Sequence, residues 1–301
     1  MRYKWVDVYR GIAVLLMLIL HFFVNIFPSQ PIWFLDYSKR GVIAFGDMDI
    51  AMFLFISGVS TYLSIAGRKN RNDAVKHAFS RYSKIFLLGL LLDVILIIIT
   101  GYVWWVLEAI GLSGIIALCF ICFPNRMKLL AILIIGVCYS YLVSFPSISL
   151  PVSSLPNGGP IGSLSLSAVV LFGYMSGEVM KKLSSLAKSG VVLMLLGFLL
   201  ANFIIYDRNV ATLPFILLSS GFCMLLMVFV YWLVELKGIS LNLLQDFGKS
   251  ALLIFVLNYP VLILAVTFGV YQAMSIAEAA FVSILLIMLF AAVLKCRFIL
   301  L

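Results

Sequence analysis

Long apolar runs constrain this chain more than any other feature. Its 301 residues are 64% hydrophobic and 11% charged, with a mean hydropathy of +1.19, whereas a soluble domain is about half apolar and a quarter charged. Several segments run for roughly 17 to 25 mostly apolar residues, the length that crosses a hydrocarbon core about 30 Å thick. The runs lack the alternation of barrel strands. The sequence therefore predicts an all-α polytopic membrane protein.

The basic residues give the predicted helices a direction. With the N-terminus in the cytoplasm, all but three of the 21 Lys and Arg residues fall on the cytoplasmic side, the exceptions being Lys39, Arg40 and Arg208. Because basic residues concentrate in cytoplasmic loops, we predict about ten transmembrane helices in the cell membrane, with both termini cytoplasmic. The predicted spans are 9–27, 42–66, 84–100, 104–123, 129–145, 163–180, 190–206, 213–234, 250–271 and 275–294.

These spans form one predicted domain, 1–301, with two notable connections. The cytoplasmic loop 67–84 holds six basic residues and His77; it either reflects topology and lipid attraction or offers a surface to a polyanionic ligand. The extracytoplasmic loop 146–162 is rich in Ser, Pro and Gly, so we expect no regular structure there. It is either a lid over an external site or a plain connection.

Charge and cysteine content indicate no other class of protein. The net charge of +9 follows from membrane topology, so we predict no nucleic-acid partner. Cys119 and Cys122 have CxxC spacing but no second pair of ligands, so we interpret them as packing residues and predict no metal. The first apolar run lacks a small-x-small cleavage site after it, so we expect an uncleaved span.

The first span carries an unusual polar stripe. Asp7, Arg10 and His21 fall on one side of a helix at about 100° per residue, with Asp7 and His21 roughly 21 Å apart along its axis. Asp7 and Arg10 at the inner boundary are either a surface ion pair or, with Gly11, a contact for a cytosolic anion. His21 lies in the outer half.

Charged groups at lipid depth are costly and therefore mark candidate sites. His21 and Asp47 are predicted at similar depth on neighbouring antiparallel helices. The pair either joins two helices or orients the imidazole as a general base, and the stripe favours the second interpretation. Glu108 is predicted in the same outer half, and Asn258 precedes a helix-interrupting Pro260. No role is assigned to Asp49, Asp93, Glu178 or Glu278.

The opening motif Asp7-x-x-Arg10-Gly11, followed by an apolar run to His21, resembles the transmembrane acyltransferase superfamily, in particular its heparan-α-glucosaminide N-acetyltransferase branch. Weaker resemblances follow in series along most of the chain. They are Asp47 with residues 52–58, residues 81–89, residues 106–112 and residues 247–258. The chain departs from the pattern where the branch has its catalytic histidine, which is Tyr37 here. His21 replaces an Asn of the branch, Asn258 replaces a late His, and Glu108 replaces Gln or His.

The resemblance implies an enzyme that takes an acetyl group from cytosolic acetyl-CoA and delivers it to an acceptor amine, often of a sugar, across the membrane. A membrane histidine acts as general base or transient acyl carrier. We therefore predict an N- or O-acetyltransferase acting on an amine or hydroxyl of an extracytoplasmic glycan or amino sugar. The lipid bilayer is a further partner, and a homodimer is compatible with this function.

The predicted site residues divide by role. Catalysis is assigned to His21 and Asp47. Acetyl-CoA binding is assigned to Asp7, Arg10, Gly11, Arg68, Lys69, Arg81 and Lys84, and acceptor binding to Asn25, Glu108 and Asn258. Two alternatives remain open: a proton-coupled transporter or flippase using His21, Asp47 and Glu108 as a relay, and a scaffold whose polar groups only pair helices. The absence of inverted repeats disfavours the transporter.

Overall fold

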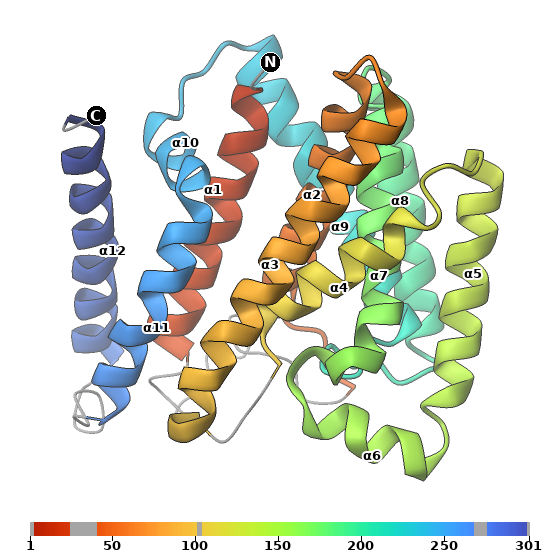
Figure 1. The fold of residues 1–301 in the computed structure, drawn as a ribbon, viewed down its shortest axis with the longest axis horizontal. Helices are drawn as coiled ribbons and strands as arrows, with labels where there is room; N and C mark the ends of the chain where they lie inside the picture. Colours follow the sequence, from red (N-terminus) through yellow and green to blue (C-terminus); the bar gives the residue numbers. More distant parts are fainter. Residues whose placement is uncertain (1–2, 25–40, 101–103, 268–275, 300–301) are drawn as a thin grey trace. The chain divides into compact units, whose positions relative to one another are not determined.

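A computed structural model describes residues 3–24, 41–100, 104–267 and 276–299 (Figure 1). Within these ranges every regular element is a helix and no strand occurs, which confirms the predicted all-α class. The chain divides into two compact units. Unit 1 consists of residues 1–37, 44–49 and 229–301, and unit 2 of residues 38–43 and 50–228.

Unit 1 is organised around α1, which packs against α10, α11 and α12. The closest approach is to α10, where a Cβ on Gly11 would overlap the Leu244 carbonyl oxygen and one on Gly248 the Asp7 carbonyl oxygen. Glycine on both helices lets the two backbones touch. The described elements of this unit are α1 (Lys4–Ile19), η1 (Leu20–Val24), η2 (Phe45–Asp47), η4 (Trp232–Leu236), α10 (Asn242–Lys249), α11 (Ala251–Thr267) and α12 (Ile276–Ile299).

Unit 2 is organised around α7, which packs against α4 and α5 and also against α2. A Cβ on Gly58 of α2 would overlap the Val170 carbonyl oxygen, and one on Gly173 of α7 the Phe55 carbonyl oxygen. The elements of this unit are α2 (Met48–Ala66, from residue 50), α3 (Arg71–Thr100), α4 (Val106–Leu118), α5 (Asn125–Leu142), α6 (Pro146–Ser154), η3 (Pro156–Gly158), α7 (Gly159–Glu178), α8 (Leu183–Leu200) and α9 (Leu213–Tyr231, to residue 228).

Helices α3 and α4 also meet through small residues. A Cβ on Gly111 would lie 2.6 Å from Phe86 Cβ, and a Cβ on Gly89 would lie 2.5 Å from Glu108 Cδ. Phe86, Gly89 and Asp93 recur at helical spacing, so one face of α3 meets α4. This interface brings the Glu108 carboxyl group into the interior of unit 2, where Glu108 is 1% exposed.

Among the residues that the structure describes, six helical segments are long and apolar enough to cross a membrane. They are Lys4–Phe22, Phe45–Ala66, Asn125–Leu142, Pro156–Glu178, Leu183–Leu200 and Leu213–Leu236. Helices α5 and α8 expose most of their apolar side chains, as expected of helices that face lipid. All ten predicted spans overlap a helix, whereas the count of ten crossings and the sides of the termini stay predictions.

The basic segment 67–84, predicted as a loop, is helical from Arg71 onward. Asn70 begins this helix, because its Oδ1 accepts a hydrogen bond from the Asn72 backbone N–H at 3.0 Å. Ala74, Ala78 and Tyr82 bury one face. That the segment is a cytoplasmic connection stays a prediction; its helix was not foreseen because the many charges concealed this short apolar face.

The segment 146–162, expected to lack regular structure, contains α6 and the start of α7. Pro146 occupies the first turn of α6, where proline costs no hydrogen bond. The Ser153 and Ser154 hydroxyls donate to the carbonyls of Leu150 and Pro151 at 3.2 and 2.9 Å. The prediction was wrong because Ser and Pro, which favour turns, here form a nine-residue helix with Pro146 in its first turn and Pro151 inside it.

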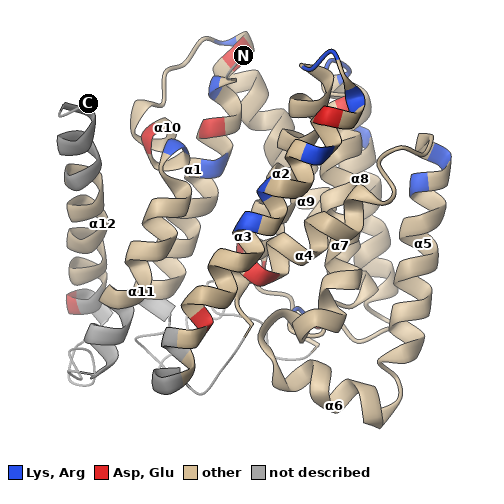
Figure 2. Ribbon diagram, in the orientation of Figure 1, with Lys and Arg blue, Asp and Glu red and all other residues tan. Residues whose placement is uncertain are grey.

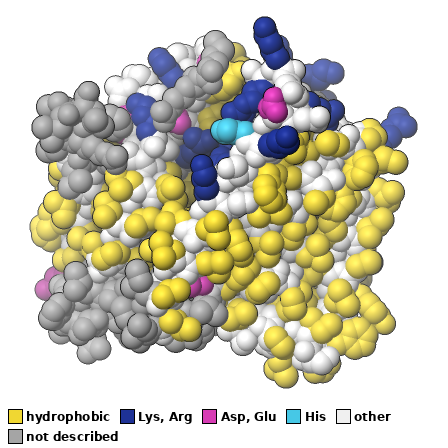
Figure 3. Space-filling model, viewed as in Figure 1, with side chains coloured by type: hydrophobic (Ala, Val, Ile, Leu, Met, Phe, Trp, Pro, Cys, Tyr) yellow, Lys and Arg dark blue, Asp and Glu magenta, His cyan; other side chains and the backbone are white. Residues whose placement is uncertain are grey.

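The surface of unit 2 separates charge from apolar area. Lys and Arg gather at the connection of α2 to α3 and at the start of α5 (Figure 2), while apolar side chains cover the visible flank (Figure 3). Many apolar side chains of unit 2 are at least half exposed, which a membrane-facing surface accommodates. Examples are Leu87, Leu91, Leu133, Val137, Leu195 and Leu199.

We expect Gly58→Ala to destabilise the protein by about 1–3 kcal/mol, the usual cost of overpacking a core. The added methyl group meets the Val170 backbone oxygen, which cannot swing away as a side chain would. Gly67→Ala is the matched control, since its Cβ would meet nothing nearer than the Leu63 carbonyl oxygen at 3.3 Å. Thermal unfolding in detergent measures both. Equal melting temperatures would contradict the close α2–α7 packing.

Candidate active site

His21 lies in a π-helical turn at the end of α1. The turn, η1, has hydrogen bonds of the i→i+5 type, and such turns occur frequently at functional sites. Its neighbour Phe22 is tied to α12: the Ser283 hydroxyl donates to the Phe22 carbonyl at 3.1 Å, and the Phe22 and Phe290 rings stack with centroids 6.1 Å apart. The turn that carries His21 is therefore held from a second helix.

Helix α11 supplies the hydrogen-bond partner of His21. Asn258, which is fully buried, places its Nδ2 2.5 Å from His21 Nδ1, and the ring of Tyr259 lies 6.2 Å from the imidazole centroid. Pro260 has no N–H to donate, so α11 lacks one helical hydrogen bond beside this contact. Asn258 was predicted to bind the acceptor; the structure brings it directly to His21.

Asp47 lies in the same unit as His21. It is fully buried in η2, and its Oδ2 accepts a hydrogen bond from the Ala44 backbone N–H at 3.3 Å. This bond gives Asp47 a capping role at the entrance to α2. The proposed pairing of Asp47 with His21 stays a prediction. Asn25, predicted at the acceptor site, lies outside the described residues.

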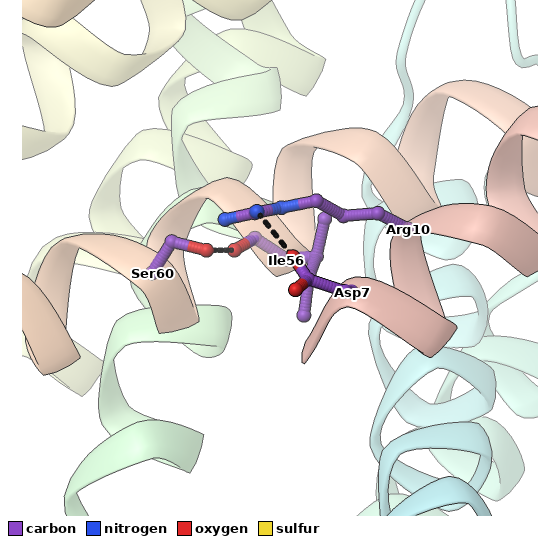
Figure 4. Close-up of polar contacts among 4 residues, drawn as sticks. All are labelled: Asp7, Arg10, Ile56 and Ser60. Atoms are coloured by element: carbon purple, nitrogen blue, oxygen red, sulfur yellow. Dashed lines mark hydrogen bonds and ion pairs between the residues drawn. The ribbon is translucent and has the colours of Figure 1, made fainter. Parts of the chain in front are cut away.

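At the start of α1, Asp7 and Arg10 form an ion pair. Arg10 Nη1 lies 3.3 Å from Asp7 Oδ1, with Asp7 1% and Arg10 32% exposed (Figure 4). The view in Figure 4 also shows the Ser60 hydroxyl donating to the Ile56 carbonyl within α2, at 2.6 Å. The space beside Gly11 is filled by the α10 backbone. Of the two side chains of the ion pair, Arg10 is the one that retains exposure.

The predicted acetyl-CoA residues of unit 2 differ in their surroundings. Arg81 Nη2 donates to Thr61 Oγ1 at 2.5 Å and to the Ser57 carbonyl at 3.4 Å, and its guanidinium lies 4.9 Å from the Tyr82 ring centroid. Arg81 therefore joins α3 to α2. The other three basic side chains are exposed and can meet a solvent-borne anion; they are Arg68, Lys69 and Lys84.

His77 is exposed within this basic segment. The nearby charge of Arg68 is the largest cause that lowers the pKa of His77 below its usual 6.5, with further contributions from desolvation, Arg81 and Lys84. The imidazole is consequently neutral at pH 7, and His77 adds no charge to the segment. Its exposure and distance along the chain from the polar stripe make it a useful control for His21.

Asp93 and Glu108 form a buried acid pair between α3 and α4. The Trp104 N–H donates to Asp93 Oδ2 at 2.7 Å and the Trp105 N–H to Glu108 Oε2 at 2.9 Å. Among the described residues, the second oxygen of each carboxyl group has no hydrogen-bond donor, and the two groups interact. A proton shared between them would satisfy both oxygens. Glu108, predicted to bind the acceptor, is thus placed in a helix interface; acceptor binding stays a prediction.

Lys128 takes part in a buried ion pair that sequence reasoning missed. Its Nζ donates to Glu178 Oε1 at 2.7 Å and Asn125 Oδ1 at 2.9 Å, and it lies 4.6 Å from the Tyr174 ring centroid. Lys128 had been counted only as a cytoplasmic charge. The pair joins α5 to α7, which gives Glu178 a structural role. In the described part of the chain, no three His, Cys, Asp or Glu side chains gather around a common metal position.

One family model matches residues 2–158, and its description is heparan-alpha-glucosaminide N-acetyltransferase, catalytic. The chain belongs to this family. A search of curated proteins finds no match. The family assignment confirms the resemblance seen in the sequence.

Membership of the acetyltransferase family bears on the site in two ways. The matched residues include His21, Asp47 and Glu108, whereas Asn258 lies beyond them. Together with the six long apolar helices, the family indicates an integral membrane protein related to transmembrane acetyltransferases. His21 is buried, whereas His77 is exposed; the assignment of catalysis to His21 stays a prediction.

Replacing Lys128 tests the buried ion pair. Lys128→Met should lower the free energy of unfolding by about 1–3 kcal/mol, at or below the lower end of the range for a broken buried pair, because Glu178 loses its partner but is 23% exposed. Lys249→Met is the matched control: the Lys249–Asp246 pair is 26% and 30% exposed, so its loss should cost less than about 1 kcal/mol. Denaturant titration of both variants measures the two losses of unfolding free energy. A smaller loss for Lys128→Met than for Lys249→Met would refute the structural role of the Lys128–Glu178 pair.

The pKa of His77 should respond to Arg68. Because the Arg68 charge is the largest cause that lowers this pKa, Arg68→Gln should raise it toward 6.5. Arg208→Gln, at the opposite predicted surface, should leave it unchanged. NMR titration of the His77 ring in a His21→Gln background, where His77 is the remaining histidine, measures the shift. An unchanged pKa in Arg68→Gln would contradict the arrangement of charges described here.

Proposed function

We propose that the protein transfers an acetyl group from cytosolic acetyl-CoA to an amine or hydroxyl group of a glycan or amino sugar on the outer side of the cell membrane. The observation that carries the proposal is the buried His21 in a π-helical turn, hydrogen-bonded to Asn258, within the residues that match the acetyltransferase family. In this proposal the ten predicted spans leave both termini in the cytoplasm.

Exposed basic side chains support the donor side of the proposal. Acetyl-CoA carries several phosphate groups, and Arg and Lys are the side chains that bind phosphate most readily. Arg10 in unit 1 and the exposed Arg68, Lys69 and Lys84 in unit 2 belong to segments predicted to be cytoplasmic. We assign the phosphate contacts to these residues. Arg81 contributes indirectly, since it fixes α3 to α2.

The proposed reaction needs one base. The acceptor nitrogen or oxygen attacks the thioester carbonyl carbon, so that a C–N or C–O bond forms and the C–S bond breaks. His21 takes the proton released by the acceptor and returns it to the departing CoA thiolate. A neutral imidazole suits this exchange because both directions of proton transfer are accessible near neutral pH. Asp47 is proposed to support the imidazole, and Glu108 and Asn25 the acceptor.

The decisive experiment compares the two histidines. His21→Gln should lower acetyl transfer about 10²–10⁴-fold, the usual contribution of a general base, whereas His77→Gln should retain activity. Purified protein in liposomes would be given acetyl-CoA and glucosamine, and the release of free CoA thiol and acetylated sugar measured. Equal activity of the wild type and His21→Gln would refute the assignment. Proton uptake without thioester consumption would favour a transporter instead.

A further inference from the structure

We infer that Asn258 is the positioning residue of His21, and that its side-chain amide selects the tautomer that transfers protons through Nε2. The inference rests on the proposed acetyl transfer for its consequence in catalysis. Its structural content, the control of a ring tautomer, can be tested without any acetyltransferase activity. It replaces the sequence-based assignment of Asn258 to the acceptor.

The contact is fixed from both sides. Asn258 is fully buried in α11, and its Nδ2 lies 2.5 Å from His21 Nδ1. His21 is 9% exposed and sits in a turn that Ser283 holds through the Phe22 carbonyl. Translation of the ring or of the Asn258 side chain is restricted in such surroundings, whereas the amide can present either Nδ2 or Oδ1 to the ring. The two residues are 237 positions apart, so helix packing, and no local turn, brings them together.

The amide determines which ring nitrogen carries the proton. As the Asn258 side chain stands, its NH₂ group faces Nδ1, which places the ring proton on Nε2. Its Oδ1 is then a buried acceptor without a hydrogen-bond donor among the described residues, a costly state. A half-turn of the amide brings Oδ1 to Nδ1. The proton then sits on Nδ1, Oδ1 gains its donor, and Nε2 has the lone pair of a base.

The same orientation serves the protonated ring. When Nε2 takes a proton, both ring nitrogens carry N–H groups, and the Asn258 Oδ1 still accepts from Nδ1. A neutral amide can therefore hold the base and its conjugate acid alike. It does so without placing a charged group against Nδ1 at lipid depth, where charges are costly. Rotation of the Asn258 amide thus converts Nε2 of His21 from a hydrogen-bond donor to a base.

The test reads the tautomer directly. The chain has two histidines, so His77→Gln leaves His21 as the remaining imidazole. Protein labelled with ¹⁵N-histidine and purified without a histidine tag would be studied by NMR in lipid nanodiscs. We expect one dominant neutral tautomer, with the proton on Nδ1, when Asn258 is present. Asn258→Leu, of similar size but without polar atoms, should give a mixture of tautomers. Asn258→Asp, which keeps an acceptor at Nδ1, should restore the single form.

The hydrogen bond from Ser283, which also holds the turn that carries His21, provides the control. Ser283→Ala removes the hydrogen bond to the Phe22 carbonyl but leaves the amide of Asn258 in place. It should keep the tautomer of the wild type. In acetyl transfer, Asn258→Leu should lose about 10²-fold in kcat/KM, Asn258→Asp should recover most of it, and Ser283→Ala should lose only a fewfold.

The outcomes separate this inference from the proposed function. Identical tautomer populations in the wild type and Asn258→Leu would overturn the inference, even if His21→Gln is inactive. A dominant proton on Nε2 in the wild type would overturn it as well. If the tautomer follows Asn258 while His21→Gln remains fully active, the positioning stands and the proposed function fails. Monodisperse elution of each variant on size exclusion confirms that it folds, and Asn258→Asp preserves the test if Asn258→Leu does not.

Discussion

Polar groups at lipid depth find no water, so each must find its partner within the protein. This constraint accounts for the polar contacts that join helices within each unit. In unit 1 an amide meets an imidazole between α11 and the end of α1. In unit 2 Lys128 pairs with Glu178. Asp93 and Glu108 accept hydrogen bonds from the backbone N–H groups of Trp104 and Trp105, just before α4. Apolar packing alone gives little preference between neighbouring helices in lipid; these polar contacts, together with glycine surfaces, specify which helices meet.

The sequence predicted those structural features that depend on neighbouring residues, such as the positions of helices along the chain. Hydropathy placed a helix in every predicted span because an apolar run of this length has few other solutions in a membrane. The opening Asp7, Arg10 and Gly11 lie on α1 as expected. Helix α10 was missed because its eight residues are too few for a clear period. Its place is determined by Gly11 and Gly248, a correspondence between distant segments that neither segment shows alone.

The polar partnerships were harder to predict than the positions of the polar residues. His21 was singled out correctly as buried, yet its hydrogen-bond partner Asn258 belongs to a helix near the other end of the chain. Depth along the membrane, the quantity used to pair His21 with Asp47, does not fix which side of a helix a residue occupies. The two positions are nevertheless related in another respect. The resemblance to the family led us to expect other residue types at both positions, and the side chains of His21 and Asn258 are in contact.

The direction of the His21 side chain depends on the number of residues that precede it in the π-helical turn at Leu20–Val24. A π turn holds one residue more than the α turn it replaces, and one residue corresponds to about 100° of rotation about a helix axis. Deleting Leu20, the residue of this turn that precedes His21, would move the imidazole back by one helical position and turn it away from α11 without changing its chemistry. A single-codon deletion would therefore disrupt the site while leaving the composition and hydropathy of the chain almost unchanged. Among related chains, a gap at this place in an alignment would mark a rotated histidine.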